Sequence, residues 1–116
     1  VFYTGSVSHE VCLQIFSAAD WMIHLAWLDH CPNVVVESLS QNCPVICTDS
    51  GGTKEIVKKN GIVLKENNPY EYELTDYDKP YDLLIPSLEL PNLEIDNSYL
   101  DIKKVAQKYV SVLEKI

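Results

Sequence analysis

Between residues 1 and 64, short apolar runs alternate with segments of helical periodicity, and this alternation limits the possible fold more than any other feature. The apolar runs cover residues 1–4, 21–27, 44–48 and 62–64. Runs of this length between turn residues predict strands. Apolar side chains three and four residues apart predict helices over residues 8–19, 34–42 and 53–59. Four strands joined by helices predict an α/β fold, with a parallel, Rossmann-like sheet and helices on both of its faces.

Single residues support several of these boundaries. Ser8 is a good N-cap for the first helix. Asn42 stands where the second helix would end, because asparagine tolerates left-handed backbone, and Pro44 prevents that helix from continuing. The run at 21–27 is apolar almost throughout, which is typical of a strand buried on both faces. His24 within it is expected to be buried, with its polar atoms satisfied.

The rest of the chain divides into two further parts. Residues 65–98 contain four prolines and many acids among tyrosines, which predicts an irregular surface segment or, as the alternative, a partner-binding one. Residues 99–116 repeat apolar side chains at helical spacing and predict a terminal helix. Because 116 residues suit a single domain, we expect residues 1–64 to form a Rossmann-like core that these two parts follow.

Charge and composition exclude several classes of function. The chain has 9 basic and 17 acidic residues and a net charge of −8, which argues against a general binder of nucleic acid or anionic membranes. No apolar run approaches the ~20 residues of a membrane-spanning helix, and no signal peptide is visible. The four cysteines form no C-x-x-C pair and no zinc-like spacing, so we expect reduced thiols and no metal site.

Three polar features follow the predicted strands at their carboxyl ends, where parallel sheets bind ligands. Asp29 and Glu37 flank the start of the second helix, whose backbone N–H groups suit an anion such as a diphosphate. The two carboxylates suit the hydroxyl groups of a sugar or a ribose. The loops at 49–52 and 5–8 follow neighbouring strands, and the glycines of the first loop would let its backbone approach a ligand closely.

Four stretches of the chain together resemble the C-terminal domain of group 1 glycosyltransferases, the retaining, nucleotide-sugar-dependent enzymes of family four with the GT-B fold. The stretches are Val1–Val7, Ala18–Asp20, Asp29–Leu39 and Pro44–Val57. The resemblance covers residues 1–64 in register and resumes at the terminal helix. It implies a partial GT-B domain that forms the donor-binding part of a glycosyltransferase. Such an enzyme transfers a sugar from a nucleotide-sugar, for example a UDP- or GDP-sugar, to an acceptor.

The resemblance implies roles for residues that face the donor sugar and the ribose. The family carries two glutamates separated by seven residues. The second binds the ribose and corresponds to Glu37, whereas the first binds the donor sugar and is replaced here by Asp29, which is one methylene shorter. His30 and Cys31 would lie beside the same sugar.

The resemblance implies further contacts through the backbone. Because Pro32 has no N–H group, Asn33 and Val34 would donate to the phosphates. The backbone of Val7 and Ser8 would edge the nucleotide base. In the family an N-terminal domain receives the acceptor, so we expect a longer, cytoplasmic protein that contacts a membrane, if at all, through that other domain. No catalytic residue is assigned in this chain, which alone would be inactive, and no cofactor is expected.

Three other interpretations stay open at this point. The same fold could serve as a non-catalytic nucleotide-sugar-binding or protein-interaction module, which the aspartate at position 29 and the acidic stretch favour. A related epimerase of the GT-B fold is another enzyme of the same architecture. A flavodoxin-like or receiver domain is disfavoured because no cluster of acids follows the first predicted strand.

Overall fold

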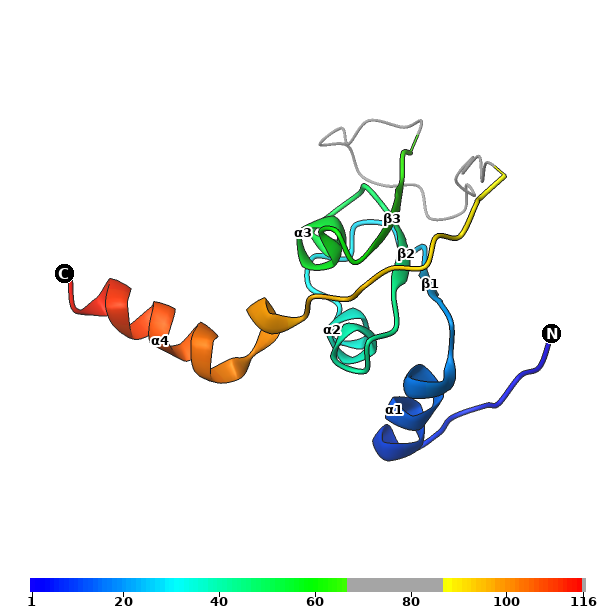
Figure 1. Cartoon of the computed structure of the whole chain (residues 1–116), viewed down its shortest axis with the longest axis horizontal. Coiled ribbons are helices and arrows are strands. Elements are labelled where there is room, and N and C mark those ends of the chain that lie inside the picture. The colour runs from blue at the N-terminus through cyan, green and yellow to red at the C-terminus, as the bar shows by residue number, and fades with distance from the viewer. Residues whose placement is uncertain (67–86, 116) are drawn as a thin grey trace.

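The protein folds around a small parallel sheet. A computed structural model describes residues 1–66 and 87–115. The three strands are β1 (Met22–His24), β2 (Val45–Thr48) and β3 (Gly61–Leu64), in the order β1-β2-β3. The helices of this part are α1 (His9–Ala18), α2 (Asn33–Ser40) and α3 (Thr53–Val57). Both strand pairs are parallel, so the predicted α/β fold with a Rossmann-like sheet is confirmed (Figure 1).

The strand predicted at residues 1–4 is wrong. This stretch has no regular structure, and the side chains of Phe2 and Tyr3 are 88% and 91% exposed. It leads away from the sheet in Figure 1 and pairs with none of the three described strands. Aromatic and β-branched residues favour strands, but the preference takes effect only when their side chains pack against a neighbouring strand. Without a neighbouring strand, that preference yields no ladder here.

β1 is not buried on both faces as the run at 21–27 predicted. It has only three residues, and the side chain of Ile23 is 65% exposed. β1 lies at one edge of the described sheet, whereas β2 lies between two neighbours and all four of its residues are buried. The central position therefore decides burial more than the length of the apolar run does.

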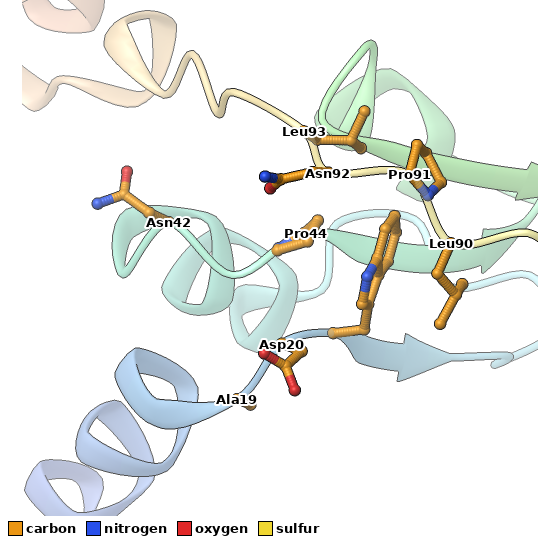
Figure 2. A pocket seen from close by; sticks show the side chains of 9 residues that line it. Ala19, Asp20, Asn42, Pro44, Leu90, Pro91, Asn92 and Leu93 are labelled. Carbon is orange, nitrogen blue, oxygen red and sulfur yellow. The ribbon is translucent and has the colours of Figure 1, made fainter.

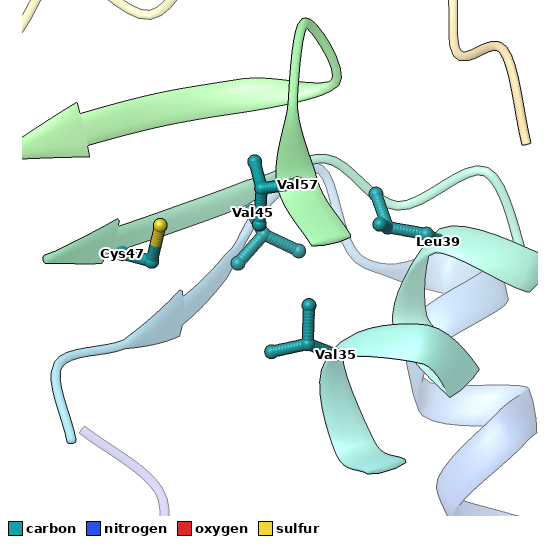
Figure 3. Close-up of a cluster of buried hydrophobic side chains, with 5 residues drawn as sticks. All are labelled: Val35, Leu39, Val45, Cys47 and Val57. Atoms are coloured by element: carbon teal, nitrogen blue, oxygen red, sulfur yellow. The ribbon is translucent and has the colours of Figure 1, made fainter. Parts of the chain in front are cut away.

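Five buried side chains form the centre of the core (Figure 3). They come from α2, β2 and α3, and they are Val35, Leu39, Val45, Cys47 and Val57. Val35 and Leu39 are four residues apart, so both lie on the face of α2 that covers the sheet. Burial raises the pKa of the Cys47 thiol to about 11. All four cysteines are unpaired, and Cys43 and Cys47 are buried.

The helix boundaries follow the signals in the sequence. Ser8 caps α1 by accepting a hydrogen bond from the Val11 N–H at 3.3 Å. Asn42 has a φ of 61°, the left-handed conformation that was predicted after α2. Both predictions are therefore confirmed.

The terminal helix is present but begins later than predicted. A short 3-10 helix, η1 (Ser98–Leu100), precedes α4 (Ile102–Leu113), whose N-terminus Asp101 caps. Residues 87–97 carry no regular element, as predicted, and the remainder of the irregular segment lies outside the described residues. α4 projects away from the sheet in Figure 1 and has no buried residue. None of the helices in the described ranges is long and apolar enough to cross a membrane.

A buried asparagine before β3 holds the segment that precedes α4 through hydrogen bonds. Asn60 is fully buried, and its amide donates to the Asp96 carbonyl at 2.9 Å and to the Tyr99 hydroxyl at 3.0 Å. Its side-chain oxygen accepts from the Asp96 N–H at 2.9 Å. The Tyr99 hydroxyl in turn donates to the Ile56 carbonyl, and Lys58 lies 3.9 Å above the Tyr99 ring. We call Asn60, Asp96 and Tyr99 the asparagine clamp.

The carboxylate of Asp96, whose backbone belongs to the clamp, is expected to make an acid-sensitive contribution to stability. The pKa of Asp96 is lowered from 3.8 to about 2. Hydrogen bonding to Ser98 is the largest cause, and hydrogen bonding to Lys59 and its positive charge add to it. A carboxyl group with a lowered pKa in the folded state stabilises above its unfolded pKa. We expect the stability advantage of the wild type over Asp96→Asn to be full above pH 3.8 and to disappear as the pH falls to about 2. Urea unfolding at a series of pH values measures this, and a pH-independent difference would contradict it.

Candidate functional site

The side chain of Asp29 lies beyond the carboxyl end of β1 and contacts a histidine from that strand. Nε2 of His24 is 3.2 Å from Oδ2 of Asp29, and the His24 side chain is only 14% exposed. The two groups are not aligned as a hydrogen bond, and Nε2 finds no other partner among the described residues. His24 is therefore mostly buried as predicted, but its polar atoms are not all satisfied. Its contact with Asp29 was not foreseen.

The backbone of Asp29 is held by the loop that follows β2. Its carbonyl accepts from the Gly52 N–H at 3.0 Å and from the Thr53 hydroxyl at 3.3 Å. A Cβ at Gly52 would lie 2.1 Å from the His30 carbonyl oxygen, which no side chain could tolerate. A Cβ at Gly51 would lie 2.5 Å from the Asp29 carbonyl oxygen. These glycines therefore let the loop pack closely against the 29–30 backbone, a role that was not predicted.

A chain of hydrogen-bonded side chains supports the turn just before Asp29. The Ser50 hydroxyl accepts from the Leu28 N–H at 3.4 Å, lies 3.0 Å from the Thr48 hydroxyl, and donates to Oε1 of Glu66 at 2.9 Å. The Glu66 N–H donates to Oδ1 of Asp49 at 3.0 Å. Sequence reasoning missed Ser50 and Glu66, since their 16-residue separation gives no local signal.

The start of α2 is open to an anion. Pro32 precedes the helix and provides no side-chain cap, and no acid lies in the first turn. The N–H groups of Val35 and Val36 donate to the Pro32 carbonyl. The N–H groups of Asn33 and Val34 precede them, and helix geometry provides no acceptor within the helix for such first N–H groups. Together with the helix dipole, they form the positive end of α2.

Glu37 lies in the second turn of α2 and contacts the first residue of α1. Its Oε1 is 3.6 Å from Nδ1 of His9, with side-chain exposures of 30% and 63%. This contact brings Glu37 close to the stretch just before α1, which contains Val7 and Ser8. Glu37, which was predicted to bind the ribose, therefore lies close to Val7 and Ser8, which were predicted to edge the base.

The remaining residues of the predicted site are accessible. His30, Cys31 and Asn33 are exposed, whereas Asp29, Val34 and Glu37 are partly buried. Over residues 1–66 and 87–115, no three His, Cys, Asp or Glu side chains gather as a metal site would need.

A shallow pocket lies at the opposite, amino end of the strands (Figure 2). Asp20 and Pro44, which precede β1 and β2, line it together with the returning stretch Leu90–Leu93. None of the predicted site residues takes part in it. This pocket is therefore separate from the region around Asp29 and Glu37.

Comparison with known proteins places the chain in a family. Residues 1–74 match the family model "Glycosyl transferases group 1". Over 61 residues the chain is 34% identical to the putative teichuronic acid biosynthesis glycosyltransferase TuaC of Bacillus subtilis (strain 168). That match covers 53% of this chain and 16% of the relative, so the chain spans only a small part of the relative's length. No solved structure matches significantly. Because the family model covers more than half of its residues, the chain belongs to the group 1 glycosyltransferases.

Proposed function

We propose that this chain is the donor-binding part of a retaining glycosyltransferase that uses a nucleotide-sugar. Glu37 binds the ribose, and Asp29 binds hydroxyl groups of the donor sugar, with His30 and Cys31 beside it. The N–H groups of Asn33 and Val34 hold the diphosphate, and the backbone of Val7 and Ser8 edges the base. The acceptor binds to a separate N-terminal domain of the longer, cytoplasmic protein.

One observation carries the proposal further than the others. The contact of Glu37 with His9 joins the second turn of α2 to the first turn of α1. A ribose bound by Glu37 would therefore have the Val7–Ser8 backbone within reach of its base. The same ribose would lie one turn from the open start of α2, where a diphosphate is favoured. The base, the ribose and the diphosphate would thus lie in the same order as the Val7–Ser8 backbone, Glu37 and the start of α2.

The geometry also indicates how this part would assist transfer. As the bond between the sugar and the diphosphate lengthens, negative charge grows on the phosphate oxygens. Fixed N–H donors at the start of α2 stabilise that charge without having to reorganise. Lys54, the lysine next to the 49–52 loop, donates to the Asp49 carbonyl at 2.8 Å, so the backbone at the start of α2 carries this task in the proposal.

A non-catalytic module of the same fold is the second candidate. The observation that favours it is the contact of Asp29 with His24, because an aspartate held 3.2 Å from an imidazole reaches less far than the family's glutamate. In that case nucleotide-sugars would bind without being turned over. Release of free nucleotide from a bound nucleotide-sugar distinguishes the two candidates.

Alkylation of Cys31 offers a direct test of the proposed site. Cys31 is exposed, so we expect N-ethylmaleimide to modify it rapidly in the full-length protein. A bound nucleotide-sugar should slow this modification, whereas Cys43 and Cys47 are buried and should stay unmodified in both states. A Cys12→Ser background removes the remaining thiol of these 116 residues, and peptide mass spectrometry assigns the modification to Cys31. UDP-glucose and GDP-mannose serve as probes, and equal rates with and without saturating nucleotide-sugar would contradict the site.

A further inference from the structure

The turn that leads into Asp29 is held in a costly conformation. Leu28 has a φ of 52°, in the left-handed region that residues other than glycine rarely adopt. Such a conformation persists only where its surroundings hold it, and it is concentrated at functional sites. The Leu28 N–H donates a hydrogen bond to the Ser50 hydroxyl at 3.4 Å. The support of this turn therefore begins with Ser50.

Glu66 determines the direction in which the Ser50 hydroxyl donates its hydrogen. A serine hydroxyl has one hydrogen to donate and two lone pairs to accept with. Ser50 donates its hydrogen to Oε1 of Glu66 at 2.9 Å. Both lone pairs of Ser50 then remain for the Leu28 N–H and the Thr48 hydroxyl. Without Glu66, the Ser50 hydroxyl would be free to rotate and to donate elsewhere.

The position of the Glu66 side chain is itself unfavourable for stability. Its Oε2 is buried and has no hydrogen-bond partner among the described residues. A buried, unsatisfied acceptor is unfavourable for stability. Its backbone is nevertheless fixed by the bond from its N–H to Asp49. The described hydrogen bonds of Glu66 lead to Ser50 and Asp49, and Ser50 in turn binds the Leu28 N–H, so the position of Glu66 is linked to the Leu28–Asp29 turn.

We propose that Glu66 is a positioning residue, which acts through Ser50 to hold the Leu28–Asp29 turn and so aims the Asp29 carboxylate at the donor sugar. This inference rests on the proposed function. Glu66 and Ser50 touch neither the nucleotide nor the sugar. Their effect falls on the sugar step alone, because Glu37 and the start of α2 are held by other contacts.

The test compares Glu66→Ala, Ser50→Ala and Glu66→Gln with the wild type in the full-length protein. Hydrolysis of UDP-glucose and GDP-mannose gives kcat and KM, calorimetry gives the affinity for UDP and GDP, and amide hydrogen exchange reports the Leu28 N–H without any ligand. Glu55→Ala is the matched control, because Glu55 is an exposed acid of α3 that lies outside this hydrogen-bonded chain.

We expect both alanine variants to exchange the Leu28 amide faster and to lower kcat by about tenfold or more, as small misplacements of a binding group do. Nucleotide affinity should stay unchanged. Glu66→Gln keeps an oxygen that accepts from Ser50 and should restore near wild-type rates. The double variant Ser50→Ala/Glu66→Ala should be no worse than either single one, because the two residues act in series.

The outcomes separate the inference from the proposed function. If the wild type binds a nucleotide but Glu66→Ala matches it in exchange and kcat, the inference is overturned and the proposed function stands. Equal impairment of Glu66→Gln and Glu66→Ala, or a parallel loss of nucleotide affinity and thermal stability, would assign a merely structural role and also overturn it. If the wild type binds neither UDP nor GDP, the proposed function is overturned, while amide exchange still decides whether Glu66 supports the turn.

Discussion

Replacement of Glu37 by alanine should weaken nucleotide binding by about tenfold or more. The expected loss follows from the hydrogen bonds that the Glu37 carboxylate is proposed to accept from ribose hydroxyl groups. Hydrogen bonds to a charged group contribute about 1.5–3 kcal/mol, and ~1.4 kcal/mol corresponds to one decade of affinity. Titration calorimetry with UDP and GDP on the full-length protein measures the effect. Wild-type affinity in Glu37→Ala would remove the proposed role of this residue.

Two further variants make that result specific. His9→Ala removes the partner of Glu37 but keeps the carboxylate, and exposed pairs of this kind contribute little, so nucleotide affinity should hardly change. Asp29→Ala should leave the affinity for free UDP or GDP intact and impair transfer, because Asp29 is proposed to bind the sugar alone. A similar loss of nucleotide affinity in all three variants would indicate a general disturbance instead of a ribose contact.

Replacement of Asn60 by alanine should lower the free energy of unfolding by about 3 kcal/mol. The side chain is fully buried, and its three hydrogen bonds join the turn before β3 to Asp96 and Tyr99. Its removal breaks these three part-buried hydrogen bonds, each of which typically contributes about 0.5–1.5 kcal/mol. Urea denaturation followed by circular dichroism measures the change.

Asn60→Asp and Asn92→Ala serve as companions to this variant. The aspartate has the same shape but replaces the two donated hydrogen bonds with an acceptor, so it should destabilise the protein about as much as alanine. Asn92 is exposed, and its replacement should stay within about 0.5 kcal/mol of the wild type. If Asn60→Asp were as stable as the wild type, the hydrogen bonds would not be what fastens this segment.

The sheet and its helices were predictable because their signals are local. The apolar runs at 44–48 and 62–64, the N-cap at Ser8 and the left-handed Asn42 each occupy a few neighbouring residues, and each was confirmed. The strand at residues 1–4 failed for a different reason, since pairing depends on a neighbour that composition cannot reveal. The burial of β1 failed in the same way, because the position of a strand within the sheet is a property of the whole fold.

The site was predictable only in part. Asp29 and Glu37 were singled out from their spacing, but their contacts with His24 and His9 join different elements and leave no periodic trace. The Gly51–Gly52 pair was recognised as allowing close approach, but its packing against the 29–30 backbone was missed, because a sequence does not say which backbone will pass closest to it. The asparagine clamp spans 36 to 39 residues and was missed altogether.

The exposed strand β1 has a practical consequence for handling the protein. Its outer edge has no neighbour among the described strands, and Ile23 lies open beside that edge. Unpaired N–H and carbonyl groups next to an apolar side chain invite pairing with a strand of another molecule. These 116 residues, if expressed alone, should therefore aggregate with rising concentration. A charged residue in place of Ile23 would act as a gatekeeper against such self-association.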